Sequence, residues 1–234
     1  MSAYGAIGRP NSGSLSPLPA TLWTNATGID NPGGIVVHHL TLQRAQKCPG
    51  LLDYLHEVFE KVVEDGLTYP QEGEMNKETF LAYFFSADVF LGISLADPQD
   101  LVDGALAPVA ELNSDNWRES VAGFYYVKPN YPGRSSHICN AGFVVPPNMQ
   151  GRRYGKLLGK SYLHYAPKLG YQASVFNLVY VKNIASVRIW ESLGFTKAGI
   201  IPSAGRLKRK DGNGEEFIDA FVFYKRFSEG LSVD

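Results

Sequence analysis

The most constraining feature of the sequence is an apolar strand that runs through a proline-bounded turn into a basic helix start. Residues 141–145 have strand composition, and two prolines follow them directly. A loop with two glycines, residues 150–155, then opens a helix expected over 150–167, because Pro167 should terminate it. The first turn of a helix leaves N–H groups unpaired and carries the positive end of the helix dipole. The segment therefore predicts an anion-binding site at the start of this helix.

The rest of the chain carries alternating strand and helix patterns. β-Branched and aromatic residues bounded by turn residues predict strands at 35–42, 89–95, 121–127, 173–181, 195–201 and 217–227. Apolar residues at helical spacing predict helices at 51–63, 79–85 and 184–193. Residues 97–117 have no firm pattern and are expected to connect across the surface. Consecutive strands early in the chain and strand–helix alternation later predict an α/β (α+β) fold with a mixed sheet.

The length of 234 residues suits one large domain. Residues 1–34 are rich in Ser, Pro, Gly and Asn, so we expect a mostly irregular tail before a folded domain at 35–234. This tail lacks the Arg-rich amphipathic character of a transit peptide, which favours a cytoplasmic location over the mitochondrial alternative. Cys48 and Cys139 form no disulfide framework and suit a reducing compartment.

The charge pattern excludes several classes of partner. A formal net charge of −1 gives no reason to expect binding to nucleic acid or to an anionic membrane. No apolar run reaches the roughly 18 residues of a membrane-spanning helix. Four basic residues lie in 206–210, but acidic residues follow at once, which favours a solvated hairpin turn. We expect no metal cofactor.

A second informative segment lies at residues 183–195. Asn183 is a good helix N-cap, Ser186 follows it by three residues, and Gly194-Phe195 closes the helix. Together with the first segment, it resembles the acetyl-CoA-binding motifs of the GNAT superfamily of N-acetyltransferases. The resemblance implies the GNAT fold, a mixed and mostly antiparallel central sheet flanked by helices, and acetyl-CoA as co-substrate.

The GNAT loop usually reads Gln/Arg-x-x-Gly-x-Gly/Ala. Here Gln150 and Gly155 match, but Arg153 replaces the first glycine. Backbone N–H groups and basic side chains of the loop would hold the pyrophosphate, and Lys160 falls toward the same side of the helix. Glycines at 151 and 155 would let the backbone approach it closely. The expected cofactor-binding residues are Val144, Val145, Gln150, Gly151, Arg152, Arg153, Tyr154, Gly155, Lys156, Asn183 and Ser186.

The proton transfers are less well defined by the sequence. Trp190 stands where many relatives have a tyrosine that is thought to protonate the departing thiolate, and an indole cannot do so. The N–H of Val144 or Val145 would stabilise the oxyanion if the strand ends splay there. His137 is a candidate general base, but a surface or packing role is the alternative, and water-relayed proton loss is the default.

Two asparagines on predicted strands need an explanation. Asn177 shares a strand face with Val175 and Val179, and Asn140 starts the strand before the cofactor loop. Burying an unpaired amide costs about 1–3 kcal/mol, so each needs either structural partners or a ligand.

The chain is similar to the fungal L-azetidine-2-carboxylate N-acetyltransferases over roughly residues 66–226. The stretches that carry this similarity include Thr68-Tyr69-Pro70-Gln71, Lys128-Pro129-Asn130-Tyr131, Cys139-Asn140-Ala141-Gly142-Phe143 and Phe176-Asn177-Leu178-Val179. The resemblance implies acceptor binding by Asn140 and Asn177. It also implies catalytic roles for Asn177 and for Asn183, the latter near the CoA sulfur.

This resemblance implies transfer of an acetyl group to the amine of a small proline-like amino acid by direct attack in a ternary complex. L-Azetidine-2-carboxylate, cis-4-hydroxyproline and an intermediate of proline metabolism are the expected acceptors, with detoxification of proline analogues as one role. One alternative is a peptide or protein N-acetyltransferase, which an acidic groove would favour. Another is a non-catalytic acyl-CoA-binding protein, for which Arg153 and Trp190 argue. Relatives of this type often pair, so we expect a homodimer.

Overall fold

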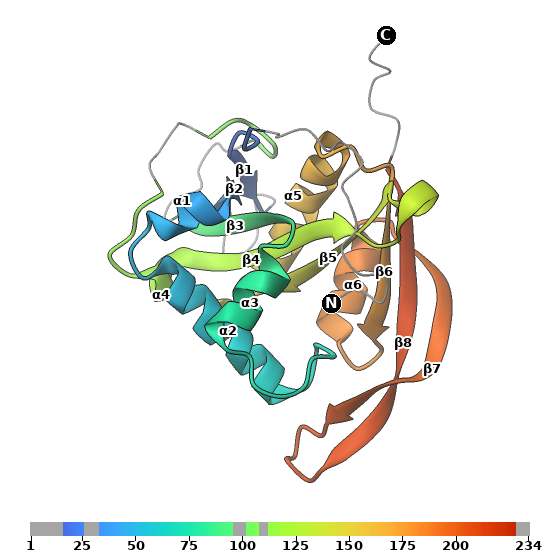
Figure 1. Ribbon diagram of the computed structural model, residues 1–234. Helices are drawn as coiled ribbons and strands as arrows, with labels where there is room; N and C mark the ends of the chain where they lie inside the picture. The colour runs from blue at the N-terminus through green and yellow to red at the C-terminus, as the bar shows by residue number, and fades with distance from the viewer. Residues whose placement is uncertain (1–15, 26–32, 96–101, 108–111, 228–234) are drawn as a thin grey trace.

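The computed structural model describes residues 16–25, 33–95, 102–107 and 112–227, and these form one eight-stranded sheet in the order β1-β2-β3-β4-β5-β6-β8-β7 (Figure 1). The strands are β1 Thr21–Thr24, β2 Gly34–Leu40, β3 Asp88–Leu95, β4 Val121–Pro129, β5 Ile138–Val144, β6 Ala173–Tyr180, β7 Thr196–Lys208 and β8 Glu215–Arg226. All neighbouring strands are antiparallel except β5 and β6, which are parallel. The predicted α/β class and the GNAT fold with its mixed, mostly antiparallel sheet are confirmed.

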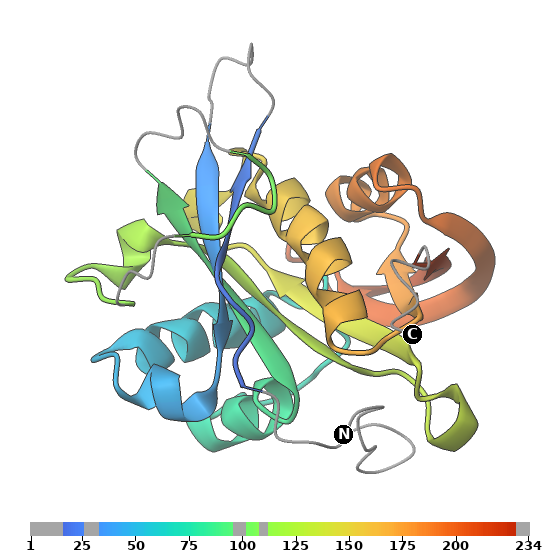
Figure 2. The same cartoon turned by 90° about the horizontal axis from the view of Figure 1, so that it is seen from above.

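Helices cover both faces of this sheet. They are α1 Leu42–Gln46, α2 Leu51–Asp65, α3 Lys77–Phe84, α4 Trp117–Ser120, α5 Tyr154–Lys168 and α6 Ile184–Ser192, with short 3₁₀ turns at Gly133–Ser135 and Pro147–Met149. In Figure 2, α2 and α3 (cyan and green) lie on the side of the sheet opposite to α5 (gold).

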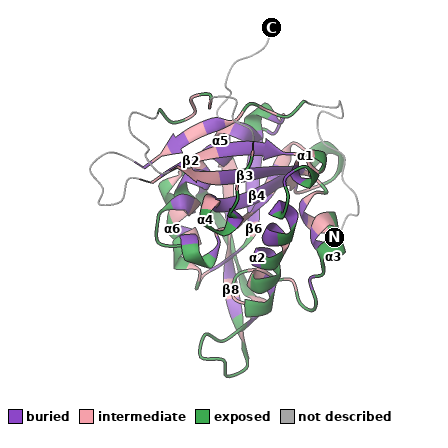
Figure 3. Cartoon of the chain, turned by 90° about the vertical axis from the view of Figure 1, so that its left-hand side faces the viewer, coloured by how far each residue is buried: buried purple, intermediate pink, exposed green. Residues whose placement is uncertain are grey.

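A hydrophobic core lies on each face of the sheet, and alternating residues of the central strands pack into one core or the other. On β4, Tyr125 packs into the core under α5, and its neighbours Phe124 and Tyr126 pack into the core under α2 and α3. This follows from the two-residue repeat of a strand, which sends successive side chains to opposite faces. Figure 3 shows the buried residues concentrated between the layers, while the far end of the β7–β8 hairpin is exposed.

Strands β5 and β6 separate soon after they begin. They pair only at Ile138 with Ala173 and at Cys139 with Ser174. On its other side, β6 carries a bulge, because three residue steps from Phe176 to Val179 match two on β8. The bulge interrupts the strict alternation, so the expected row of Val175, Asn177 and Val179 on one strand face is not continuous. Beyond Cys139 the two strands therefore diverge. We call the region between the diverging strands the splay, and Cys139 lies at its closed end.

Several element boundaries differ from the expectation. Residues 21–24, expected within a mostly irregular tail, form β1 and pair with β2, while residues 1–15 and 26–32 lie outside the described residues. Trp23 of this strand is buried because it packs into the α5 core, so tertiary contacts order the segment. Helix α5 starts at Tyr154 instead of 150 and ends at Lys168, one residue beyond the expected stop.

The basic stretch 206–210 also differs from the expectation. Its residues up to Lys208 belong to β7, and the hairpin turn begins only after them. The strand continues because Arg206 and Lys208 stay paired with β8, and the Arg206 side chain pairs with Glu72 at 3.0 Å and with Glu215 at 3.1 Å.

Candidate active site

The loop before α5 keeps an unusual backbone conformation. Gly151 has φ +79°, and Arg153, the N-cap of α5, has φ +63°. This left-handed region is open to glycine and costs other L-residues on the order of 1 kcal/mol or more. Arg153 therefore occupies a backbone geometry that suits the glycine usual in the GNAT pattern, and the loop retains its turn despite the substitution.

This loop presents a set of free donors. The N–H groups of Lys156 and Leu157 bond to the carbonyl of Arg153, at 3.1 and 3.4 Å, which starts the helical bonding. Within the described part of the chain, no acceptor meets the N–H groups of residues 151–155. The side chains of Arg152, Arg153 and Lys156 are exposed beside them. These groups together favour a phosphate-bearing ligand.

Three of the residues expected on the cofactor side make contacts elsewhere in the structure. Tyr154 is buried and packs near Gly33. A Cβ added at Gly155 would lie 3.1 Å from Ile189 Cδ1, so this glycine also permits close packing of α5 on α6. Lys160 donates to Asp103 at 2.6 Å and to the carbonyl of Thr24 at 3.3 Å, which removes it from the expected basic side.

The pairing of β5 decides which of its N–H groups face the splay. The N–H of Asn130 bonds to the carbonyl of Ile138 at 2.8 Å, and the register continues through Lys128 opposite Asn140 to Phe124 opposite Val144. In an antiparallel ladder, bonded pairs alternate, so Val144 directs its N–H toward β4. The N–H of Val144 is therefore not available as the expected oxyanion donor.

The same alternation turns other groups of β5 toward β6. Ala141 and Phe143 direct their N–H groups to the side where the two strands have parted. Val145, just beyond the strand, has the same parity, and its carbonyl accepts a 3.4 Å hydrogen bond from the exposed Gln150 side chain. The splay is thus lined by backbone donors of Ala141, Phe143 and Val145.

Helix α6 borders the splay with a capped start. The Asn183 side chain accepts a hydrogen bond from the N–H of Ser186 at 3.2 Å, which confirms the predicted N-cap. The Ser186 hydroxyl in turn accepts the indole N–H of Trp190 at 2.9 Å. Trp190 is only 5% exposed and packs on Phe143 and Phe176, so it is a core residue with a satisfied donor.

Three asparagines meet at the closed end of the splay. Asn130, in the turn after β4, accepts amide N–H bonds from Asn140 at 3.0 Å and from Asn177 at 2.7 Å. Asn177 accepts in return from Asn130 at 3.2 Å and from the Tyr131 hydroxyl at 3.4 Å. We call these four residues the amide cluster. It brings together two residues that the sequence singled out, Asn140 and Asn177, through a third that it did not.

Asn130 and Tyr131 are members of the cluster that were not expected from the sequence. Both lie in the stretch Lys128-Pro129-Asn130-Tyr131, whose composition marks a turn after a strand. The available signal was their adjacency to a strand end in a segment shared with the resembling family. His137 remains apart, because its ring nitrogen bonds to the carbonyl of Arg134 at 3.1 Å, which fits the surface or packing role.

Two tyrosines press against β5 near the cluster, on the face covered by α2 and α3. Tyr69 donates its hydroxyl to the carbonyl of Phe143 at 3.2 Å. A Cβ added at Gly142 would lie 2.7 Å from the Tyr69 hydroxyl and 2.6 Å from Tyr126, so only glycine admits both rings. Burial raises the pKa of both phenols well above 10, which keeps them neutral.

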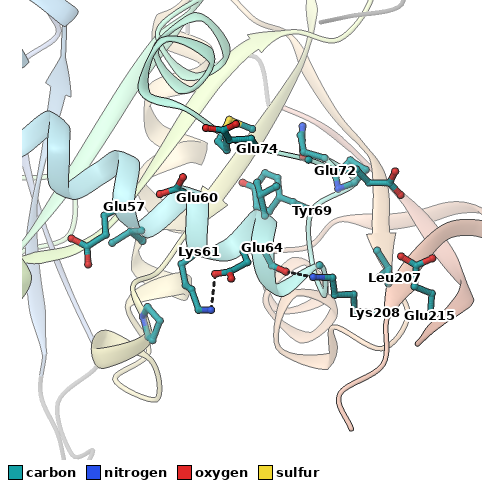
Figure 4. A pocket seen from close by; sticks show the side chains of 18 of the residues that line it. Glu57, Glu60, Lys61, Glu64, Tyr69, Glu72, Glu74, Leu207, Lys208 and Glu215 are labelled. Carbon is teal, nitrogen blue, oxygen red and sulfur yellow. Dashed lines mark hydrogen bonds and ion pairs between the residues drawn. The ribbon is translucent and has the colours of Figure 1, made fainter. Parts of the chain in front are cut away.

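A cleft of about 850 Å³ opens on the same side as Tyr69, between α2, the loop 66–75 and the β7–β8 hairpin (Figure 4). Its charged lining consists of six glutamates and four basic residues: Glu57, Glu60, Glu64, Glu72, Glu74, Glu215, Lys61, Arg118, Arg206 and Lys208. Three of the basic residues pair with glutamates of the lining, as in Lys61 with Glu64 at 2.8 Å and Arg118 with Glu57 at 2.7 Å. The fourth, Lys208, donates to the backbone carbonyl of Glu64 at 2.6 Å. Tyr69 lines the cleft and also touches β5, so it links the cleft to the splay.

Among the described residues, no group of three or more His, Cys, Asp or Glu side chains is arranged to hold a metal ion. None of the helices that the described ranges contain has the length and apolarity to cross a membrane.

Comparison with known proteins agrees with this architecture. The family model for the acetyltransferase (GNAT) family matches residues 74–195. N-acetyltransferase aca1 of Schizosaccharomyces pombe is 39% identical over 177 residues, covering 76% of this chain and 80% of that protein. Protein SPT10 of Saccharomyces cerevisiae is 28% identical over 206 residues, and the match covers 76% of this chain but only 32% of SPT10.

Solved structures share the fold at low sequence identity. A GCN5-related N-acetyltransferase from Kribbella flavida superimposes with a TM-score of 0.59 at 22% identity, covering 82% of this chain and 97% of that one. The yncA protein of Salmonella typhimurium, solved with its cofactor acetyl-CoA, gives a TM-score of 0.59 at 16% identity, covering 86% and 98%. The chain belongs to the acetyltransferase (GNAT) family and is an acetyl-CoA-dependent N-acetyltransferase.

Proposed function

We propose that this enzyme transfers the acetyl group of acetyl-CoA to the amine of a small proline-like amino acid, by direct attack in a ternary complex. The observation that carries this proposal is the amide cluster at the closed end of the splay. Neutral amides there can bind a small polar acceptor, because each amide keeps an N–H to donate and Asn140 keeps an oxygen that no group of the described ranges occupies.

The cofactor would lie along the splay. Its phosphates would meet the free N–H groups of residues 151–155 together with Arg152, Arg153 and Lys156. From Cys139 to Val144, β5 spans roughly 16 Å at about 3.3 Å per residue, which separates the phosphate end from the amide cluster. The long pantetheine arm would run between these ends and bring the thioester to the cluster.

Each step of the acetyl transfer would be assisted by a different group at the closed end of the splay. The neutral acceptor nitrogen attacks the thioester carbon, the carbon–sulfur bond breaks, and CoA leaves as a thiolate. The backbone N–H of Ala141 or Phe143 would stabilise the oxyanion that forms on the carbonyl. Asn140, whose Oδ1 has no hydrogen-bond partner within the described ranges, would accept from the amine, with Asn177 beside it, and the proton would pass to water. Asn183 would lie near the CoA sulfur and hold the thioester in position for the attack.

The departures from the GNAT pattern do not favour loss of catalysis. Arg153 holds the left-handed conformation of the loop, and Trp190 packs in the core against Phe143 and Phe176. The thiolate is then left to solvent or to a donor other than Trp190.

The deciding assay measures release of free CoA from acetyl-CoA with L-azetidine-2-carboxylate, cis-4-hydroxyproline and a panel of peptides. The proposal expects turnover with the cyclic amino acids and little with the peptides. Turnover confined to peptides would refute it.

A peptide or protein amine is the second candidate acceptor. The cleft beside Tyr69 favours it, because its lining has more glutamates than basic residues and would suit a cationic segment. Of the glutamates, Glu60 and Glu74 form no ion pair within the described part of the chain. The peptide panel should therefore include sequences rich in lysine and arginine.

We also propose a homodimer in the cytoplasm. The edge strand β7 exposes Ile200 and Ile201, at 53% and 40%, and an exposed apolar edge suits association of two copies. Cys48 and Cys139 are both buried free thiols, as suits a reducing compartment. Light scattering on the purified protein tests the dimer, and a mass of one chain would refute it. Imaging of a tagged full-length chain tests the location, and a signal confined to mitochondria would refute it.

A further inference from the structure

Lys128 lies near the end of β4 in an unusual position for a lysine. Its Nζ is 4.3 Å from the ring centre of Tyr83 and 4.2 Å from that of Tyr126. The two rings stand at 84° to each other, and their hydroxyls are hydrogen-bonded at 2.8 Å. The rings therefore form a fixed corner that holds the ammonium group against two aromatic faces.

Within the described ranges, this ammonium group has no anionic partner. No carboxylate of the described residues lies within ion-pair distance of Lys128, and its side chain makes no hydrogen bond with them. The groups packed around the corner are Tyr69, Tyr83 and Tyr126, and burial raises the pKa of each phenol, so all three are neutral. Burial lowers the pKa of Lys128 to about 8. A half-buried cation without a counter-ion is costly unless a ligand supplies one.

The position of Lys128 relative to the amide cluster suggests which ligand does so. Lys128 is the cross-strand partner of Asn140 in the β4–β5 ladder, and the bonded pairs of this ladder put both side chains on the same face. Asn140 belongs to the amide cluster and keeps its Oδ1 free of partners in the described ranges. A cation and an amide acceptor thus start from directly opposite positions on one face of β4 and β5, next to the amide cluster.

We propose that Lys128 binds the α-carboxylate of the acceptor while Asn140 receives its amine. In an α-amino acid, a single carbon separates the amine from the carboxylate, so the two groups are close together. Two side chains from opposite positions on neighbouring strands, such as Asn140 and Lys128, are spaced to bind one group each. This assignment rests on the proposed function, and it makes Lys128 the residue that selects amino acids over amines without a carboxylate. It also assigns the selection of the acceptor to side chains of the sheet and not to the glutamate-lined cleft.

The test compares two acceptors that differ only in charge, L-azetidine-2-carboxylate and its carboxamide. The wild-type enzyme should prefer the carboxylate, and Lys128→Met should lower the ratio of the two kcat/KM values by about tenfold or more, since a charge-assisted bond is lost. Lys128→Arg, which keeps the charge, should retain more of this preference. An equal loss for both acceptors, or no loss, would overturn the assignment.

The pH dependence gives a second readout. Lys128 must be protonated to bind a carboxylate, so the wild-type preference should decline as pH rises through about 8. The amines of the two acceptors also titrate, and the Lys128→Met enzyme measures that contribution by itself. A preference with the same pH profile in both enzymes would count against Lys128.

A binding measurement separates this inference from the proposed function. Failure of wild-type enzyme to acetylate either acceptor would refute the proposed function. The ¹³Cε NMR signal of Lys128, assigned with Lys128→Arg, still reports its pKa when free amino acids and their amides are added without acetyl-CoA. A raised pKa with carboxylate-bearing ligands alone supports the inference, and an unchanged pKa across a panel of amino acids refutes it.

Discussion

Asn130 is the hub of the amide cluster, and its removal tests whether the cluster organises the acceptor site. It accepts bonds from Asn140 at 3.0 Å and from Asn177 at 2.7 Å, and it donates one to Asn177 at 3.2 Å. Asn130→Ala removes all three. A hydrogen bond contributes about 0.5–1.5 kcal/mol net, and these amides are only half-buried, so the lower part of that range applies.

Three such bonds give a total of about 1.5–2.5 kcal/mol. Because Asn130 acts through Asn140 and Asn177, most of this loss should appear in acceptor binding and turnover. We expect the kcat/KM for the cyclic amino acid to fall by roughly 10- to 70-fold, since about 1.4 kcal/mol corresponds to tenfold. The KM for acetyl-CoA should change little, because the cofactor loop lies at the other end of the splay.

The assay is CoA release under variation of one substrate at a time. Asn130→Asp keeps an oxygen that accepts from both neighbours, and it should fall between Asn130→Ala and the wild type. Asn213→Ala, in the exposed turn between β7 and β8, is the matched control and should be silent. Wild-type acceptor kinetics in Asn130→Ala would show that Asn140 and Asn177 are held without the cluster. An equal rise in both KM values would point to general disruption.

Three further predictions concern residues singled out by the sequence. Arg152→Glu combined with Arg153→Glu should raise the KM for acetyl-CoA far more than that for the acceptor, and equal effects would argue against the phosphate site. Asn140→Ala and Asn177→Ala should leave binding of CoA, measured by calorimetry, close to wild type while acceptor turnover collapses; loss of CoA binding or unfolding would indicate a structural role. Asn183→Asp should preserve the cap and the melting temperature but lower kcat about tenfold or more, because it places a negative charge beside the departing thiolate. An unchanged kcat in this variant would show that Asn183 is only a cap.

Local sequence was sufficient where short-range chemistry sets the structure. The apolar run before Pro146 predicted β5, and the Asn183 cap with Gly194 predicted α6, because strand composition and helix capping act over a few residues. The start of α5 was less well predicted. The basic residues after Gln150 suit a helix, but the left-handed backbone at Arg153 delays the helix to Tyr154.

Other features required the tertiary structure because they join distant segments. Residues 21–24 have no strong pattern of their own and become a strand only because β2 and the α5 core accept them. The role of Gly155 depends on Ile189 of another helix. The side of β5 that presents free N–H groups depends on its register with β4, which the composition of a single strand does not specify.

The sequence by itself determined the family resemblance, the cofactor class and the identity of three of the asparagines, because these reside in short motifs whose chemistry is carried by residue type. Only the tertiary structure decided what those residues do together. It joined Asn140 to Asn177 through Asn130, and it placed Lys128, the residue opposite Asn140 on β4, in a corner of two neutral tyrosines. The physical reason is that hydrogen-bond partnership and the environment of a charge depend on which strands are neighbours, and a strand's neighbours are fixed by the packing of the whole sheet.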